Sequence, residues 1–203
     1  MKLYNSIGPN PRVVRMFMAE RGIELPREEV DLRGGENRRE PYLAKNPFGQ
    51  MPALELDDGT VIAEIIPICE YLDETTEGPS LIGATAKERA ETRMWVRRLD
   101  LNIIEPLANG FRFSEGLKLF ENRIHVIPQA ADDLKQVAQG WLGRLDGMMA
   151  GKDWICGARF TLADIFLFCF LDFGDGVGQK LNRDNRAIAA WFDRVKARPS
   201  TAA

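Results

Sequence analysis

Residues 46–72 read NPFGQMPALELDDGTVIAEIIPICEYL, and this stretch decides the fold of the first part of the chain. Two short β-prone runs, residues 52–56 and 61–63, flank the sequence Asp-Asp-Gly at 57–59, and Asp-Gly is a preferred turn between hairpin strands. The helical spacing of apolar residues resumes over 65–72. The stretch therefore predicts a β-hairpin that leads directly into a helix.

The residues that precede this stretch predict a strand–helix–strand opening. Residues 1–4 are expected to form a strand, 11–21 a helix with one apolar side, 28–32 a second strand and 38–45 a short helix. A β-α-β opening followed by β-β-α is typical of an α/β unit with a mixed sheet. We therefore expect one α/β domain over residues 1–75.

Strand signals fade in the second part of the chain. Residues 76–85 are rich in Thr, Gly, Ser and Pro, which is typical of a linker. Beyond them, apolar residues recur at helical spacing in four stretches: 86–107, 117–149, 162–170 and 186–197. This periodicity predicts an all-α helical bundle over residues 86–203.

The composition excludes several classes of protein. With 45% hydrophobic and 28% charged residues the chain is typical of a globular protein, and a net charge of −3 gives no positive field to attract nucleic acid or an anionic membrane. Cys69, Cys156 and Cys169 form no CxxC pair and His125 is the single histidine, so we expect no disulfide framework and no metal site. Without a signal peptide or an apolar membrane-spanning stretch, we expect a cytoplasmic protein with no nucleic-acid and no membrane partner.

The segment SIGPNPR at residues 6–12 joins the first strand to the first helix. Pro11 suits the first helical position, and Asn10 would then be the N-cap residue. A capping role alone explains this sequence. Alternatively, the helix N-terminus would stabilise a bound thiolate, with Asn10 or Ser6 donating a further hydrogen bond to the sulfur.

Two further positions admit both a structural and a functional interpretation. Pro52 stands where a strand begins, either as an ordinary loop residue entering an edge strand or in a cis Met51–Pro52 bond beside a bound peptide. Glu64 precedes a helix that should start near Ile65. Its carboxylate would either compensate the helix dipole or bind a substrate ammonium group.

Thr161 and Asp164 have the spacing of a capping box, in which a threonine side chain and an acidic side chain three residues later satisfy each other's backbone N–H groups. The pair predicts a helix start near residue 162. We assign it a structural role rather than a catalytic one.

Five motifs in this order resemble the cytosolic glutathione transferase family over essentially the whole chain, as a bacterial-type member of uncertain class. They are GPNPR (8–12), NPFGQMPAL (46–54), AEIIPICEYL (63–72), FTLADI (160–165) and the closing WF and RPS of 191–200. The resemblance implies a thioredoxin-like N-terminal domain with a mixed four-stranded sheet, an all-helical C-terminal domain and usually a homodimer. It also implies the cis bond at Pro52.

The same resemblance implies a glutathione site, with glutathione as co-substrate and no tightly bound cofactor or metal. The backbone of Met51, beside Pro52, would pair with the cysteinyl part, and Gln50 stands where the family often binds the glycyl carboxylate. Glu64 matches the acidic residue that approaches the γ-glutamyl ammonium. Ile65 replaces the usual serine, so only its backbone N–H would meet the γ-glutamyl carboxylate.

The resemblance leaves the catalytic residue open among three. Asn10 aligns with the cysteine of beta-class members, Tyr4 lies near the tyrosine of the tyrosine-using classes, and the serine of theta-like members falls around Gly8. As the catalytic residue that contacts the thiolate, we rank Asn10 first, Ser6 second and Tyr4 third. The serine-serine-cysteine signature of maleylacetoacetate isomerase-like members is missing, which disfavours that activity.

The reaction implied is attack by the glutathione thiolate on a small hydrophobic electrophile. Phe111, Arg112 and Phe113 are candidate walls of the electrophile site, although these residues would equally pack a helix end on the core. Two other functions use the same fold. One is glutathione-dependent disulfide reduction, because Pro9-Asn10 is similar to the sequence of some such members, and the other is a noncatalytic protein-binding module.

Overall fold

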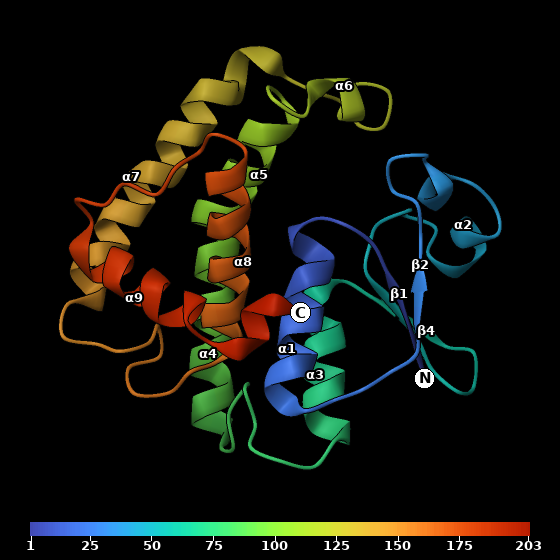
Figure 1. Cartoon of the computed structure of the whole chain (residues 1–203), viewed down its shortest axis with the longest axis horizontal. Helices are drawn as coiled ribbons and strands as arrows, with labels where there is room; N and C mark the ends of the chain where they lie inside the picture. Colours follow the sequence, from blue (N-terminus) through green and yellow to red (C-terminus); the bar gives the residue numbers. More distant parts are fainter. The chain divides into compact units, whose positions relative to one another are not determined.

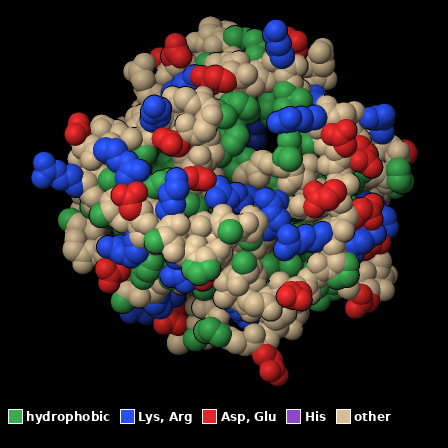
Figure 2. All heavy atoms as spheres, viewed as in Figure 1, with side chains coloured by type: hydrophobic (Ala, Val, Ile, Leu, Met, Phe, Trp, Pro, Cys, Tyr) green, Lys and Arg blue, Asp and Glu red, His purple; other side chains and the backbone are tan.

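The computed structural model describes residues 1–203, and the chain divides into two compact units. The first comprises Met1–Leu81 with Ala202–Ala203, and the second Ile82–Thr201. None of the helices combines the length and the apolar character that a membrane crossing requires. On the face shown in Figure 2, basic and acidic side chains are interspersed among apolar ones.

The first unit contains a mixed four-stranded sheet with strand order β2-β1-β3-β4, as in a thioredoxin-like domain. Strands β1 and β2 are parallel, and β3 runs antiparallel to both β1 and β4. The elements along the chain are β1 (Lys2–Asn5), α1 (Pro9–Arg21), β2 (Arg27–Glu29), the 3-10 turn η1 (Glu36–Arg38), α2 (Tyr42–Lys45), β3 (Ala53–Glu55), β4 (Val61–Ala63) and α3 (Ile65–Thr75).

Alternation along the strands separates the two faces of this sheet. Leu3 and Leu54 lie opposite each other in register and are fully buried on one face, while Tyr4 and Ala53 are paired on the other. Tyr4 and Ala53 belong to a buried cluster that includes Tyr42 of α2. Helices α1 and α3 pack against each other on the Leu3 side (Figure 1). The sheet is therefore covered on both faces.

Two predicted elements of the first unit differ in the structure. The helix expected over 38–45 is divided into η1 and α2, because the residue before a proline disfavours helical backbone and Glu40 precedes Pro41. The strand expected over 28–32 is the shorter β2, which pairs with β1 only through residues 27–29. The hairpin and the helix that begins at Ile65 are confirmed.

The second unit is all-helical, as predicted. Helix α8 (Leu162–Gly176) runs through its core and is buried at every position from 162 to 171. The remaining elements are α4 (Ala86–Leu99), the π-helical segment η2 (Asp100–Ile104), α5 (Glu105–Arg112), α6 (Leu117–Phe120), the 3-10 turn η3 (Pro128–Ala130), α7 (Ala131–Met149), α9 (Arg186–Lys196) and the 3-10 turn η4 (Pro199–Ala202).

The capping box at the start of α8 is confirmed, and the helical stretch expected over 117–149 consists of α6 and α7, which are separate helices. Helix α6 ends at Phe120, and the chain resumes helical structure only in the 3-10 turn at Pro128. Proline lacks an N–H group and cannot continue a helix, so α7 begins only after this turn.

Candidate functional site

The strand register brings four segments of the first unit together at one end of the strands, which is called the sheet edge below. Tyr4 lies opposite Ala53, and Ala53 lies opposite Ala63. Because β3 is antiparallel to both neighbours, its beginning lies beside the ends of β1 and β4, and the parallel strand β2 ends there too. The segments that meet at this edge are 6–8, 30–33, 50–52 and 64–65.

Three buried side chains hold the loop that precedes β3. Asn37 Nδ2 donates to the Gly49 carbonyl at 2.6 Å. The Tyr42 hydroxyl and Asn46 Nδ2 donate to the Gln50 carbonyl at 2.6 and 2.9 Å. Both carbonyls before Met51 are therefore fixed by donors from η1, from α2 and from Asn46, the residue that follows α2. Removing one partner of such a buried hydrogen bond destabilises the protein, because the other partner is left unsatisfied.

Met51 and Pro52 follow this fixed loop and begin the site proper. The Met51–Pro52 bond is cis, as the resemblance implies, and both residues are buried, whereas Gln50 is exposed. Met51 lies in a bend just before β3 rather than inside the strand. The edge thus combines a buried backbone segment with an exposed amide side chain.

Glu64 occupies a backbone conformation that side chains rarely adopt. Its φ of 72° and ψ of 140° place it at the N-cap of α3, and it is the one residue other than glycine with positive φ. Its exposed carboxylate forms no side-chain cap hydrogen bond. A strained residue of this kind costs about 1–3 kcal/mol and is typical of functional sites. Glu64 therefore forms no capping hydrogen bond, and both of its predicted roles, compensation of the helix dipole and binding of an ammonium group, stay predictions.

The prediction that Asn10 is an N-cap residue is wrong. Helix α1 begins at Pro9, Gly8 is its N-cap with φ 104°, and Asn10 is the second helical residue. Either proline suits a first helical turn, since neither has an N–H group to leave unpaired, and the structure uses Pro9 as the first position. Of the first three helical residues, 9 to 11, only Asn10 therefore offers a backbone N–H at this helix end.

The hydroxyl groups of Ser6 and Tyr4 are already engaged. Ser6 Oγ donates to the Val30 carbonyl at 2.7 Å and is buried. The Tyr4 hydroxyl donates to Glu55 Oε2 at 2.5 Å, on the sheet face covered by α2, and burial together with the Glu55 carboxylate raises the pKa of Tyr4. Which of Asn10, Ser6 and Tyr4 donates to a bound sulfur stays a prediction.

A cavity of about 240 Å³ opens at the same edge, at the carboxyl ends of the parallel strands β1 and β2. Its walls include Ser6, Ile7 and residues 29–33, with the charged side chains Glu29, Asp31 and Arg33. Sequence reasoning missed the segment after β2, because no local motif marks it. Only the parallel pairing of β1 with β2 brings it to the site.

The three candidate electrophile-site residues lie at the end of α5 in the helical unit. The Phe111 ring packs edge-on against Phe120 and Phe173, with centroids 6.1 and 4.9 Å apart. Arg112 lies over the Phe120 ring at 5.9 Å, and Phe113 is buried. These contacts are those of a packed helix end, and the role of these residues in an electrophile site stays a prediction.

Comparisons with known proteins agree with this architecture. Residues 7–75 match the glutathione S-transferase N-terminal domain, and residues 119–199 match the glutathione S-transferase C-terminal domain. The crystal structure of a glutathione S-transferase domain-containing protein from Marinobacter aquaeolei is 37% identical, covers 99% of this chain and 100% of its own, and superposes with a TM-score of 0.93.

Two curated relatives span almost the whole chain. Glutathione S-transferase 2 of Saccharomyces cerevisiae is 31% identical over 200 residues, covering 95% of this chain and 84% of its own length. FtsZ-localized protein A of Caulobacter vibrioides is 30% identical over 202 residues, covering 95% of this chain and 85% of its own. With both domains matched in order around a thioredoxin-like sheet, the chain belongs to the glutathione S-transferase family.

Proposed function

We propose that the sheet edge binds glutathione, stabilises its thiolate and directs it at a small hydrophobic electrophile. Family membership supports glutathione transferase activity in general. The observation that carries the finer proposal is the convergence of residues 50–52, residues 64–65 and the first turn of α1 at one edge. An extended tripeptide laid along this edge would meet all three.

Each part of glutathione has a matching group at this edge. The exposed amide of Gln50 would bind the glycyl carboxylate, and the Met51 backbone would pair with the cysteinyl part. The γ-glutamyl ammonium would meet the carboxylate of Glu64, while its carboxylate would accept from the Ile65 N–H at the N-terminus of α3. The ammonium and the carboxylate of the γ-glutamyl part would thus bind to two consecutive residues, Glu64 and Ile65.

Asn10 is the residue we propose to stabilise the thiolate. A free thiol has a pKa of about 8.5, so only a few per cent is ionised at neutral pH, and hydrogen bonds to the sulfur raise that fraction. At the second position of α1, Asn10 offers both a backbone N–H and a side-chain N–H, together with the positive end of the helix dipole.

The proposed chemistry needs no covalent intermediate with the protein. The deprotonated sulfur forms a bond to an electrophilic carbon, and the leaving group departs with the electron pair of the broken bond. The protein contributes binding of the tripeptide, orientation of the sulfur and stabilisation of its negative charge.

Two substitutions at Glu64 separate binding from strain. Glu64→Gln keeps the backbone conformation and removes the charge, so glutathione affinity should fall about tenfold or more with stability unchanged. Glu64→Gly should weaken binding similarly but raise the free energy of unfolding by up to about 1 kcal/mol, because relieved strain exceeds the entropic cost of glycine. Calorimetric titration and denaturant unfolding measure the two effects. Unchanged affinity in Glu64→Gln would remove Glu64 from the site.

A second pair of variants tests Asn10. Asn10→Ala should raise the thiol pKa of bound glutathione. Asn10→Asp should raise it further, because a carboxylate opposes the thiolate, while stabilising the helix N-terminus by about 0.3–1 kcal/mol. Ultraviolet titration of the thiolate and thermal melts measure both properties. A normal thiol pKa in Asn10→Asp would exclude Asn10 from the sulfur site and make Ser6 the next candidate.

We also propose that the protein is a homodimer, the state usual in the family. Light scattering across micromolar protein concentrations should give twice the mass of one chain. A mass of one chain throughout that range would contradict the proposal. This outcome would leave the glutathione site untouched, since residues 6–12, 50–52 and 64–65 all belong to one chain.

A protein-binding role is the second candidate function, and one relative favours it. FtsZ-localized protein A is nearly as similar to this chain as the yeast transferase. Glutathione affinity, followed by assays with an aryl halide and with a small disulfide, distinguishes the functions. Turnover of the aryl halide supports the transferase, turnover of the disulfide alone supports a disulfide reductase, and binding without turnover favours the protein-binding role.

A further inference from the structure

A chain of hydrogen bonds joins helix α1 to the ends of strands β1 and β2. Arg15, in the middle of α1, donates through Nη1 to Asn5 Oδ1 at 2.7 Å and to the Ser6 carbonyl at 3.1 Å. Asn5 Nδ2 in turn donates to Glu29 Oε1 at 2.6 Å. We call the three side chains of Arg15, Asn5 and Glu29 the Arg15 network. It lies at the sheet edge, beside the segment that leads into α1.

The central side chain of the network, Asn5, is 5% exposed, and both ends of its amide are bonded. Its oxygen accepts from the Arg15 guanidinium and its nitrogen donates to the Glu29 carboxylate, so one orientation of the amide satisfies both charged partners. Hydrogen bonds to charged groups are stronger than those between neutral groups. The half-buried Arg15 is thus held at a defined position against β1.

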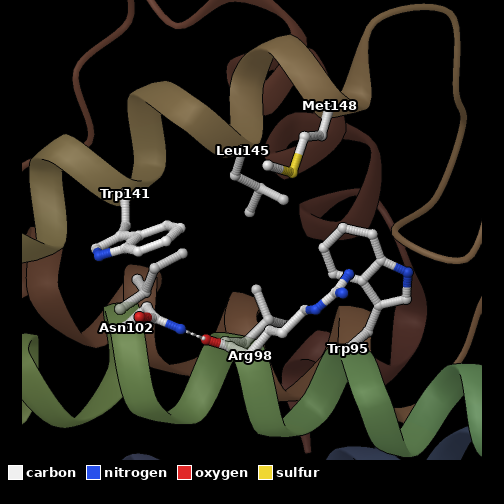
Figure 3. Close-up of a pocket in the computed structure, with 8 residues that line it drawn as sticks. Trp95, Arg98, Asn102, Trp141, Leu145 and Met148 are labelled. Atoms are coloured by element: carbon white, nitrogen blue, oxygen red, sulfur yellow. Dashed lines mark hydrogen bonds between the residues drawn. The ribbon is translucent and has the colours of Figure 1, made fainter.

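These bonds connect separate elements rather than successive turns of one helix. Arg15 and Asn5 are 10 residues apart, and Asn5 and Glu29 are 24 residues apart. In the helical unit, by contrast, Asn102 Nδ2 donates at 2.8 Å to the carbonyl of Arg98, which is 4 residues earlier (Figure 3). A bond of that local kind positions a side chain on its own helix, whereas the Arg15 network fixes a helix relative to two strands.

The network reaches across the turn between β1 and α1. Ser6 is held from two sides, because its hydroxyl donates to the Val30 carbonyl at 2.7 Å and its carbonyl accepts from Arg15. Only Ile7 and Gly8 separate it from α1. The Ile7 side chain is 50% exposed, and no atom lies within 4 Å of the position that a Cβ of Gly8 would take. Packing therefore contributes little to this turn, and the hydrogen bonds at Ser6 fix the direction of the α1 N-terminus.

We propose that Arg15 is a positioning residue for the glutathione sulfur. By binding the Ser6 carbonyl across the turn, it sets the direction in which the N–H groups of Asn10, in the same helix, meet the sulfur. This inference rests on the proposed function, since it requires a thiolate at the first turn of α1. Arg15 acts through the Ser6 peptide and the helix, while Asn5 and Glu29 hold its guanidinium in place.

A change in this direction affects the reaction more than the binding of glutathione. A hydrogen bond weakens steeply as its angle departs from linearity, and a displacement of about 1 Å can slow a reaction about a hundredfold. The tripeptide itself is proposed to be held mainly by Gln50, Met51 and Glu64, which belong to other segments. Loss of the network should therefore raise the thiol pKa of bound glutathione and lower kcat, with little change in KM.

Three variants of the full chain test this proposal. Arg15→Met should raise the thiol pKa of bound glutathione and lower kcat for an aryl halide about tenfold or more, with the KM for glutathione within about twofold of the wild type. Arg15→Lys keeps the charge and an N–H donor, so it should recover part of both losses. Arg27→Met is the matched control, because it removes the same charge from an exposed position at the other end of β2, and it should change neither property.

A fourth variant, Asn5→Leu, separates position from charge. It alters no charge in the network and keeps a similar side-chain volume, but it removes one of the two acceptors of Arg15. A raised thiol pKa in this variant supports the positioning role. A normal thiol pKa in Asn5→Leu beside a raised one in Arg15→Met would assign the effect of Arg15 to its charge alone and overturn the proposal. Ultraviolet titration measures the thiol pKa, and thermal melts identify a temperature at which every variant is folded.

The outcomes also distinguish the positioning role from the proposed function. A wild type that binds no glutathione contradicts both. A wild type that binds and turns over glutathione, beside an Arg15→Met variant with lower stability but unchanged thiol pKa and kcat, contradicts only the positioning role and makes Arg15 a structural residue. A loss confined to the KM for glutathione would also overturn the proposal, because it would assign Arg15 to binding of the tripeptide instead of orientation at the sulfur.

Discussion

Asp164→Ala is expected to lower the free energy of unfolding by about 4 kcal/mol, because three buried N–H donors lose their acceptor. Asp164 is fully buried at the start of α8. Its carboxylate accepts from the Ile155 N–H at 2.9 Å, the Thr161 N–H at 2.9 Å and the Trp191 indole N–H at 2.8 Å. One side chain thus ties the first turn of α8 to the preceding loop and to α9. Denaturant unfolding measures the loss.

The pH dependence of this loss has a defined sign. Burial raises the pKa of Asp164 to about 6, against the opposing effect of its three N–H donors. The native state therefore binds this proton more tightly than the unfolded state between about pH 4 and pH 6, and the wild type gains stability from this group as the pH falls. The difference in free energy of unfolding between the wild type and Asp164→Ala should therefore grow as the pH falls from about 6 to about 4. Asp175→Ala, exposed on the same helix, is the control; a deficit that shrinks would contradict the account.

Arg21→Met is expected to cost about 3–5 kcal/mol, since it leaves a buried carboxylate without its cation. Arg21 at the end of α1 pairs with Asp73 of α3, with exposed side-chain fractions of only 1% and 5%. Arg21 also donates to the Thr76 carbonyl at 2.9 Å, and the Leu81 N–H donates to Asp73 at 2.9 Å. The pair therefore joins two helices and the segment that follows them.

A double-mutant cycle isolates this pair. Adding Asp73→Asn to Arg21→Met removes the unpaired charge while keeping an oxygen for the Leu81 N–H, so the double variant should recover part of the loss. Unfolding curves of the four proteins give the coupling free energy. Strictly additive losses would show that the two side chains stabilise the unit independently.

The parts of the fold that were predicted correctly are those with local causes. The hairpin follows from one Asp-Gly turn between β-prone runs, and the start of α8 follows from Thr161 and Asp164 within one turn. The start of α1 was misplaced because Pro9 and Pro11 fit a first turn equally well, and only the structure shows which comes first. The local sequence determines that a helix forms here, whereas tertiary packing determines the residue at which the helix begins.

Motifs support the proposed site only in part, because sequence reasoning does not reach the groups that depend on contacts between distant residues. Positions 50–52 and 64–65 carry a recognisable sequence. By contrast, the Ser6 hydroxyl donates a hydrogen bond to the Val30 carbonyl, 24 residues away in the sequence, and no local sequence pattern predicts this contact. Asn37, Tyr42 and Asn46 hold the carbonyls before Met51, and only the folded loop shows which groups they reach.

Amide chemical shifts of the full chain, recorded while glutathione is added, test the central claim most directly. The account predicts saturable shifts concentrated in three segments at one edge of the sheet: residues 6–12, 50–52 and 64–66. Glu64→Gln should need a higher glutathione concentration to reach the same shifts. Saturable shifts confined to the helical unit, or no saturable shift at all, would contradict the assignment of this edge as the glutathione site.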